Sequence, residues 1–236
     1  PWLKDRRADI SWNFWNRYRD YLENEKGFSP KVLAGVDLLT DRILDSLFDP
    51  TEKIVIDKRG LVVGQVQSGK TSNYSGLICK AADSGFKLII VLAGIHNNLR
   101  SQTQQRIDES FLGFDTQHQR ASNTSLKNMG VGYPINKLVA HSITSSLENG
   151  DFSAGAANSL GLNFNTNDPI VAVVKKNGRV LERLLVWLKS NATVQADGKL
   201  TIRGKSLLLI DDEADNASIN TNPEDDKSTR INGLIC

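Results

Sequence analysis

Residues 64–71 have the composition and spacing of a loop that binds phosphate groups. They fit the pattern G-x-x-x-x-G-K-[ST] at every position. Glycines let backbone N–H groups approach a phosphate closely, and N–H groups at the start of a helix stabilise its negative charge. The lysine of the pattern reaches the β- and γ-phosphates, and its threonine hydroxyl binds Mg²⁺. Unless the pattern is an accidental glycine turn, we expect a nucleoside triphosphate with Mg²⁺ to bind at Gly64, Gln67, Ser68, Gly69, Lys70 and Thr71.

A second group of reactive side chains follows the apolar run at residues 207–210. Asp211, Asp212 and Glu213 come directly after it. Carboxylates at the carboxyl end of a parallel strand lie on the same edge of the sheet as a phosphate-binding loop. We assign Asp212 as a ligand of Mg²⁺, and Glu213 as the residue that orients or deprotonates the attacking water. Lys70 is the second catalytic residue. Asp211 competes with Asp212 for the metal, and a solvated acidic turn is the alternative for all three acids.

The scaffold must bring both groups to one edge of a sheet, and the hydrophobic pattern predicts such a scaffold. Short, continuous apolar runs are typical of strands that are buried on both faces of a parallel sheet. Strands are expected at residues 61–63, 88–93, 137–141 (the weakest), 170–174 and 206–210. Helices are expected at residues 71–82, 99–111 and 180–188, with Gly85 and Gly113 ending the first two. This alternation predicts an α/β fold with a central parallel sheet, and residues 142–168 are expected to form a long surface loop.

The first 50 residues have a different pattern. Apolar residues recur there at helical spacing. Ser29 is a suitable N-cap and Pro30 suits the first helical position, so a helix is expected to begin there. We therefore predict an N-terminal helical segment at residues 1–50 and a nucleotide-binding domain at residues 51–236.

Composition sets limits on the remaining possibilities. The 236 residues include 29 basic and 27 acidic side chains, so any nucleic-acid site must depend on local charge. Two cysteines and the lack of a signal peptide favour a reducing, cytoplasmic location. No apolar run approaches the roughly 20 residues of a membrane span. The chain begins at Pro1 and ends at Cys236 within an apolar stretch, so we expect it to be part of a longer protein.

Two motifs carry a resemblance to a known group of proteins. Residues 212–215 read D-E-A-D after an apolar strand, and together with residues 64–71 they resemble the first RecA-like domain of superfamily-two helicases and translocases. Residues 60–71 and 92–103 are similar to those of the bacterial Z-one-domain proteins. These are helicase-like ATPases, often labelled endonucleases, that are linked to DNA restriction and defence. The resemblance implies a RecA-like fold, ATP and Mg²⁺ as ligands, ATP hydrolysis, DNA translocation and partner proteins in defence.

The resemblance also implies a path for DNA. Segment 94–106 occupies the position of the helicase motif that grips the nucleic-acid backbone, and a second such position follows the strand at 170–174. Donor side chains suited to phosphate oxygens occur at both. The expected contacts, which would show little sequence preference, are Asn97, Asn98, Arg100, Gln102, Lys175 and Lys176. An ordinary capped helix start and a solvated helix face are the alternatives.

Other expected features of a helicase are missing from the sequence. It contains no second RecA-like domain, whose arginine finger can accelerate hydrolysis by about 10³–10⁵. We therefore expect the isolated chain to hydrolyse ATP weakly or not at all. A nucleotide switch for signalling or assembly that binds no nucleic acid is the alternative function. A GTPase switch is disfavoured because residues 136–139 lack the aspartate of the guanine-binding motif.

Overall fold

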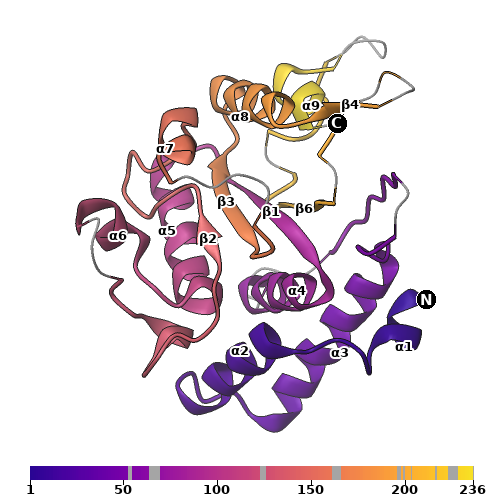
Figure 1. Ribbon diagram of the computed structural model, residues 1–236, viewed down its shortest axis with the longest axis vertical. Helices are drawn as coiled ribbons and strands as arrows, with labels where there is room; N and C mark the ends of the chain where they lie inside the picture. The colour runs from indigo at the N-terminus through magenta and orange to yellow at the C-terminus, as the bar shows by residue number, and fades with distance from the viewer. Residues whose placement is uncertain are drawn as a thin grey trace.

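A four-stranded parallel sheet forms the centre of the protein (Figure 1). The computed structural model describes the chain except residues 53–54, 64–69, 123–125, 161–165, 196–197, 199, 203, 216, 223–227 and 236, and the side chains of Lys70 and Ser122. The sheet has the order β2-β3-β1-β6. Its strands are β1 (Phe86–Ala93), β2 (His141–Ser142), β3 (Ile170–Lys175) and β6 (Ser206–Asp211). The predicted α/β fold with a central parallel sheet is confirmed.

Strands β1 and β3 are buried on both faces, as their continuous apolar runs predict. Only Lys87 in β1 and Lys175 in β3 are not buried. Successive side chains of a strand point to opposite faces of the sheet. Ile89 and Val171 accordingly belong to one hydrophobic core, whereas Leu88 belongs to the other.

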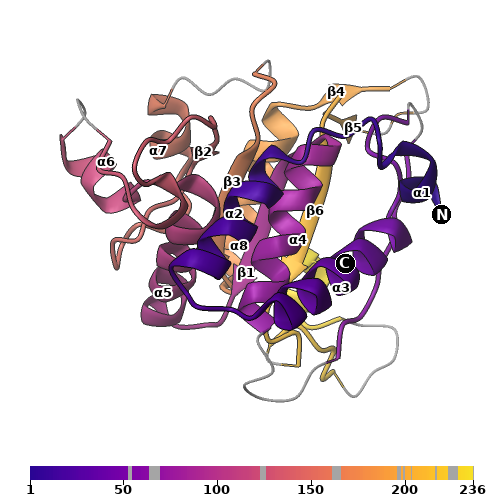
Figure 2. The ribbon, with the colours of Figure 1, turned by 90° about the horizontal axis from the view of Figure 1, so that it is seen from below.

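Helices cover both faces of the sheet. On one face lie α2 (Asn13–Asn24), α3 (Pro30–Ser46) and α4 (Lys70–Ser84), which Figure 2 shows side by side. On the other face lie α7 (Ala154–Ser159), α8 (Gly178–Ser190) and α9 (Arg230–Ile235). The helices predicted at residues 71–82 and 180–188 correspond to α4 and α8. Gly85 ends α4 with a φ of +117°.

The connection from β1 to β3 begins with α5 (Asn97–Ile107), which continues directly into a π-helical turn, η1 (Asp108–Leu112). Gly113 follows with a φ of +81°, and its N–H donates to the Asp108 carbonyl at 2.8 Å. A glycine adopts this left-handed conformation without strain. The helix predicted at residues 99–111 and its end at Gly113 are thus confirmed.

The remaining elements are short. They are α1 (Trp2–Arg6), α6 (Thr116–Ser122), a 3₁₀ turn η2 (Gly130–Gly132), and a hairpin of β4 (Thr193–Val194) and β5 (Leu200–Thr201). Within the described ranges, no helix has the length and apolar character needed to cross a membrane.

Three predictions about local structure are wrong. Residues 61–63 are irregular and exposed rather than a strand, because no described strand pairs with them. Of residues 137–141, only His141 joins a strand. The predicted surface loop at 142–168 contains α7, and Ile143 and Phe152 in it are buried in the core beside α8.

Strand β6 lies at one edge of the sheet. Among the described residues it pairs only with β1, from Phe86↔Ser206 to Leu92↔Asp211. Leu207 and Leu209 are 42% and 39% exposed. The outer edge of β6 therefore combines unpaired backbone groups with apolar side chains.

The N-terminal helices share a hydrophobic core with the sheet. Ser29 caps α3 as predicted, since its side chain accepts a hydrogen bond from the Val32 N–H. The ring of Trp15 packs on Gly76 of α4, where an added Cβ would come within 3.1 Å of the ring. Helices α2 and α3 therefore pack directly on the helix that begins with Lys70.

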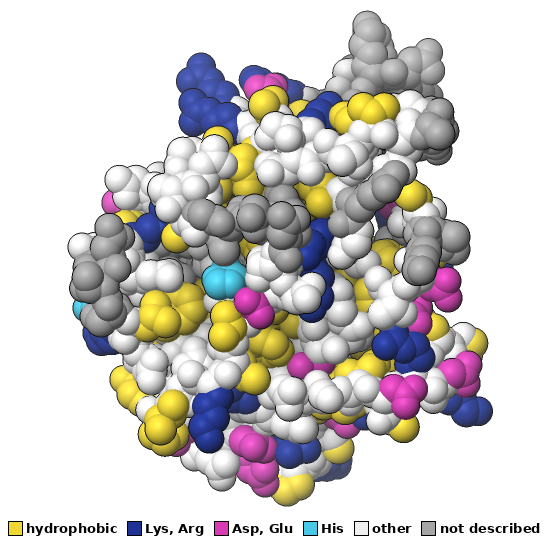
Figure 3. Space-filling model, in the orientation of Figure 1, with side chains coloured by type: hydrophobic (Ala, Val, Ile, Leu, Met, Phe, Trp, Pro, Cys, Tyr) yellow, Lys and Arg dark blue, Asp and Glu magenta, His cyan; other side chains and the backbone are white. Residues whose placement is uncertain are grey.

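Charged side chains of both signs are spread over the surface in Figure 3. Among the described side chains on that face, the basic ones alternate with acidic and apolar ones and form no continuous basic stripe. A protein that tracks a nucleic-acid backbone commonly presents such a stripe.

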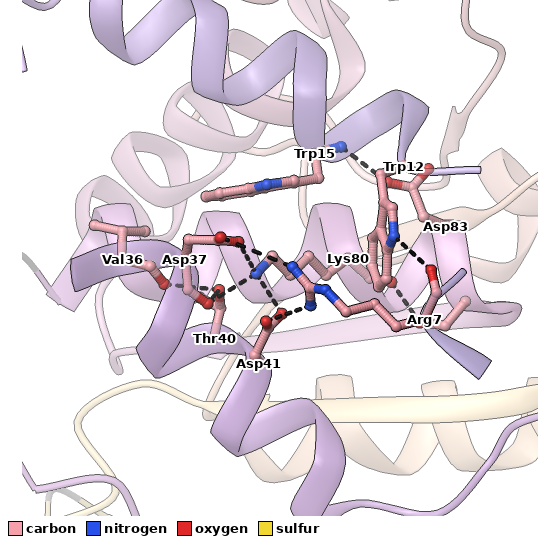
Figure 4. Close-up of polar contacts among 10 residues, drawn as sticks. Arg7, Trp12, Trp15, Val36, Asp37, Thr40, Asp41, Lys80 and Asp83 are labelled. Carbon is pink, nitrogen blue, oxygen red and sulfur yellow. Dashed lines mark hydrogen bonds and ion pairs between the residues drawn. The ribbon is translucent and has the colours of Figure 1, made fainter. Parts of the chain in front are cut away.

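A buried lysine joins α3 to α4 (Figure 4). The Nζ atom of Lys80 lies 2.5 Å from a carboxylate oxygen of Asp37 and 2.6 Å from one of Asp41. The same Nζ atom lies 4.4 Å from the ring centroid of Trp15, and Arg7 forms an ion pair with Asp41 on the outside. The positive charge of Lys80 is thus compensated on all sides by groups of α2 and α3.

Candidate functional site

The carboxyl edge of the sheet brings together the start of α4 and the ends of β1, β3 and β6. Lys70 and Thr71 are the first two residues of α4. Of the predicted phosphate-binding residues, Gly64, Gln67, Ser68 and Gly69 lie outside the described residues, and so does the side chain of Lys70. The described part of the site therefore begins at Thr71.

The acidic turn after β6 is held by a buried lysine. Lys176 follows β3, its side chain is 0% exposed, and its Nζ lies 2.7 Å from Asp211 Oδ1. The same Nζ donates to the Glu213 carbonyl at 2.5 Å. The backbone N–H of Lys176 donates to the carbonyls of Ala93 and Gly94 at the end of β1. Lys176 thus spans from β3 across β1 to the turn, and it engages Asp211, the alternative metal ligand.

Glu213 adopts a backbone conformation that is uncommon for its type. Its φ is +58°, in the left-handed region. Its carboxylate lies over the end of β1, since a Cβ at Gly94 would be 3.2 Å from Glu213 Oε2 and 3.0 Å from the Leu99 side chain. The glycine at position 94 therefore leaves the space that this carboxylate uses.

Four polar side chains lie together beside the first turn of α4. The guanidinium of Arg106, at the end of α5, lies 3.5 Å from the Thr71 hydroxyl. The hydroxyl of Tyr74 is buried, and no described group has hydrogen-bond geometry with it. Burial and, to a smaller extent, the neighbouring Asp212 carboxylate raise the pKa of this hydroxyl, whereas Arg106 lowers it. Asp212 is therefore close enough to Tyr74 to act on it electrostatically.

This set of donors and acceptors fits Mg²⁺ and phosphate. Mg²⁺ in nucleotide sites is commonly held by one or two carboxylates, a hydroxyl, phosphate oxygens and water. Thr71 and Asp212 can supply the hydroxyl and the carboxylate, and the buried hydroxyl of Tyr74 lies beside Thr71 and Arg106. The described residues contain no cluster of three or more His, Cys, Asp or Glu side chains suited to a metal. A metal held by protein ligands alone is therefore not indicated among them.

Arg100 does not occupy the surface position predicted for a DNA contact. It is fully buried, with 0% exposure. Its guanidinium donates to the carbonyls of Ser145, at 2.8 Å, and Leu147. Burial lowers the pKa of this guanidinium. Its physical role here is to satisfy backbone carbonyls of the segment after β2, and its predicted phosphate contact stays a prediction that the buried position does not favour.

The two lysines at the end of β3 also make internal contacts. Lys176 is buried against Asp211, a position that does not favour its predicted contact with DNA. Lys175 donates to the Asn97 side chain at 2.7 Å, and both residues are partly exposed. Asn98 and Gln102 are exposed on α5. Three of these side chains, at positions 97, 98 and 175, therefore lie near one another at the surface.

A hollow of about 400 Å³ runs along α5. Gln102, Gln105 and Arg106 line it from that helix, and Asp115 and Gln117 line it from the segment beyond η1. Its walls are polar, in contrast to the mostly apolar walls of typical small-molecule pockets.

Sequence reasoning alone does not single out Tyr74 or Arg106. The spacing of α4 places Tyr74 with its apolar residues, and nothing in the pattern marks its hydroxyl. Arg106 stands at the far end of segment 94–106, and only its basic side chain could have drawn attention to it. Tyr74 lies about one turn after Thr71 on α4 itself, and the packing of η1 on α4 brings Arg106 to Thr71.

We compared the chain with protein-family models, with curated proteins and with solved structures. No family model matches, and neither comparison with individual proteins found a match.

Proposed function

We propose that this chain binds ATP with Mg²⁺ and serves as the motor domain of a helicase-like ATPase with a RecA-like fold. The observation that carries the proposal is the complete phosphate-loop pattern at residues 64–71, whose last two residues begin α4. A nucleotide at the switch region of a parallel sheet is the common arrangement in α/β proteins. The four-stranded parallel sheet is compatible with this fold.

Each residue has a defined part in the proposed chemistry. Residues 64–70 cradle the phosphates with backbone N–H groups and the Lys70 ammonium, and Thr71 and Asp212 hold Mg²⁺. Glu213 orients the attacking water or accepts its proton. Bound Mg²⁺ neutralises charge on the phosphates. Because an arginine finger from a second domain contributes much of the rate in such enzymes, the chain alone hydrolyses ATP slowly.

Fewer residues are available to contact a nucleic acid than the sequence suggests. Asn97, Asn98, Gln102 and Lys175 are accessible donors for a DNA backbone, and restriction or defence proteins would be the partners. The internal roles of Arg100 and Lys176 favour the second candidate, a nucleotide switch that binds no nucleic acid. Fluorescence-anisotropy titration with labelled DNA at low salt distinguishes the two, because only the motor binds, with a salt-dependent affinity.

Isothermal titration calorimetry with ATP and Mg²⁺ tests the nucleotide site. We expect Lys70→Ala to weaken ATP binding by more than tenfold, because a charge-assisted contact with phosphate is worth about 1.5–3 kcal/mol. Lys4→Ala, an exposed lysine of α1, is the matched control and should leave the affinity unchanged. Equal affinities of wild type and Lys70→Ala would contradict the proposal.

A further inference from the structure

Four basic side chains lie on α5 or at the end of β3, and three of them have an internal partner. Arg100 binds two backbone carbonyls, Lys175 binds Asn97, and Lys176 pairs with Asp211. Arg106 is exposed, and among the described residues it forms no ion pair. Its guanidinium lies 3.5 Å from the hydroxyl of Thr71, the residue that would bind Mg²⁺.

The acidic residues next to Arg106 in sequence are engaged elsewhere. Asp108 is buried and accepts hydrogen bonds from the Gln104 side chain and from both the N–H and the hydroxyl of Thr116. Glu109 pairs with Lys26 at 2.8 Å. Neither carboxylate therefore neutralises the guanidinium of Arg106.

The backbone of Arg106 is fixed against α4. Its carbonyl accepts a hydrogen bond from the Ser110 hydroxyl at 2.6 Å, and that hydroxyl lies 3.1 Å from the Ser75 hydroxyl on α4. Ser75 and Ser110 are both buried. The π-helical turn η1 provides this contact, and such turns occur frequently at functional sites. These hydrogen bonds anchor the backbone that carries the guanidinium beside the first turn of α4.

We infer that Arg106 binds the γ-phosphate of the nucleotide and makes the site prefer a triphosphate to a diphosphate. This inference rests on the proposed nucleotide site. A guanidinium and Mg²⁺ repel each other, so negative charge between them stabilises both beside the Thr71 hydroxyl. The γ-phosphate adds such charge to that of Asp212, and a guanidinium matches its oxygens in a two-pronged geometry. A diphosphate lacks the group that Arg106 contacts.

The test is calorimetric titration of the chain with ATP and with ADP, each with Mg²⁺, and it requires no turnover. We expect wild type to prefer ATP, and Arg106→Ala to lower the ATP affinity about tenfold while the ADP affinity changes less than twofold. Arg106→Lys, which keeps the charge but not the planar fork, should restore part of the preference. Arg183→Ala, at an exposed position on α8, is the matched control and should match wild type.

The outcomes separate this inference from the proposed function. If wild type binds both nucleotides, Lys70→Ala weakens both, and Arg106→Ala leaves the ATP-to-ADP ratio unchanged, the role of Arg106 is refuted and the nucleotide site stands. If wild type binds neither nucleotide, both proposals fall. Circular dichroism of Arg106→Ala checks that its fold is intact, as expected for an exposed side chain.

Discussion

Among the side chains that the structure describes, two lysines are fully buried, Lys80 and Lys176, and they stabilise different parts of the protein. Lys80 lies between α3 and α4, where Asp37 and Asp41 accept its hydrogen bonds and Trp15 covers it (Figure 4). Lys176 lies at the carboxyl edge of the sheet, where it binds Asp211 and the backbone of the acidic turn. In both cases the charge is compensated at close range, as burial requires.

The surroundings decide what each lysine stabilises. Both partners of Lys80 belong to one helix, so its contacts fasten the N-terminal helices to the helix that begins at Lys70. The partners of Lys176 lie at the end of a strand and in a turn with a left-handed residue, so its contacts set the position of Glu213. The same chemistry supports the fold in one region and the geometry of the candidate site in the other.

Replacing Lys80 should give the largest effect on stability. Lys80→Met leaves two carboxylates that are 38% and 22% exposed with only Arg7 as an ion-pair partner among the described residues. Loss of one member of a buried pair costs about 3–5 kcal/mol, and the partial exposure places this case at the lower end. Urea denaturation measures the change. Lys31→Met, at an exposed position of α3, is the control, and a loss for Lys80→Met no larger than for this control would show that Lys80 does not fasten the helices.

A buried carboxyl in the same helical region should make stability depend on pH. Burial raises the pKa of Asp83 to about 6, although N–H groups of Trp15 and Phe14 and the charge of Arg17 act in the opposite direction. Because the folded pKa exceeds the unfolded value, this carboxyl stabilises the fold most when protonated, below about pH 4, and the contribution is lost as pH rises through 6. Relative to Asp83→Asn, wild type should lose about 2 kcal/mol between pH 4 and 7. A constant difference in urea midpoints over this range would contradict the assignment.

Replacing Lys176 should have a smaller effect on stability and a specific effect on metal binding. In Lys176→Met the turn that carries Asp212 is no longer held, so the gain in ATP affinity on adding Mg²⁺ should fall about tenfold, or about 1.4 kcal/mol. Binding of ATP without Mg²⁺ should change little. Lys175→Met, its partly exposed neighbour, is the control. If Lys176→Met loses as much stability as Lys80→Met does and keeps the Mg²⁺ effect, both buried lysines only stabilise the fold.

The sequence predicts the buried framework well and the roles of individual charges poorly. Continuous apolar runs correctly predict β1, β3 and β6, although only β1 and β3 are buried on both faces and β6 has Leu207 and Leu209 exposed. Residues 61–63 are apolar too, but a strand requires a neighbour to pair with, and the pattern of a segment does not reveal whether one exists. Arg100 and Lys176 are basic side chains of the kind that binds phosphate at a protein surface. Their burial depends on carbonyls and a carboxylate more than 30 residues away in the chain.

We expect the outer edge of β6 to influence how copies of this chain meet at high concentration. Its backbone groups, which pair with no other described strand, and its half-exposed leucines can template a strand from another molecule. Lys205 precedes the strand, and Asp212 and Glu213 follow it. Parallel alignment of two such edges would bring like charges together, whereas antiparallel alignment brings Lys205 opposite the acidic turn. An antiparallel pair has two-fold symmetry and uses up both edges. The order of charges along β6 therefore favours closed pairs of molecules over open-ended aggregates.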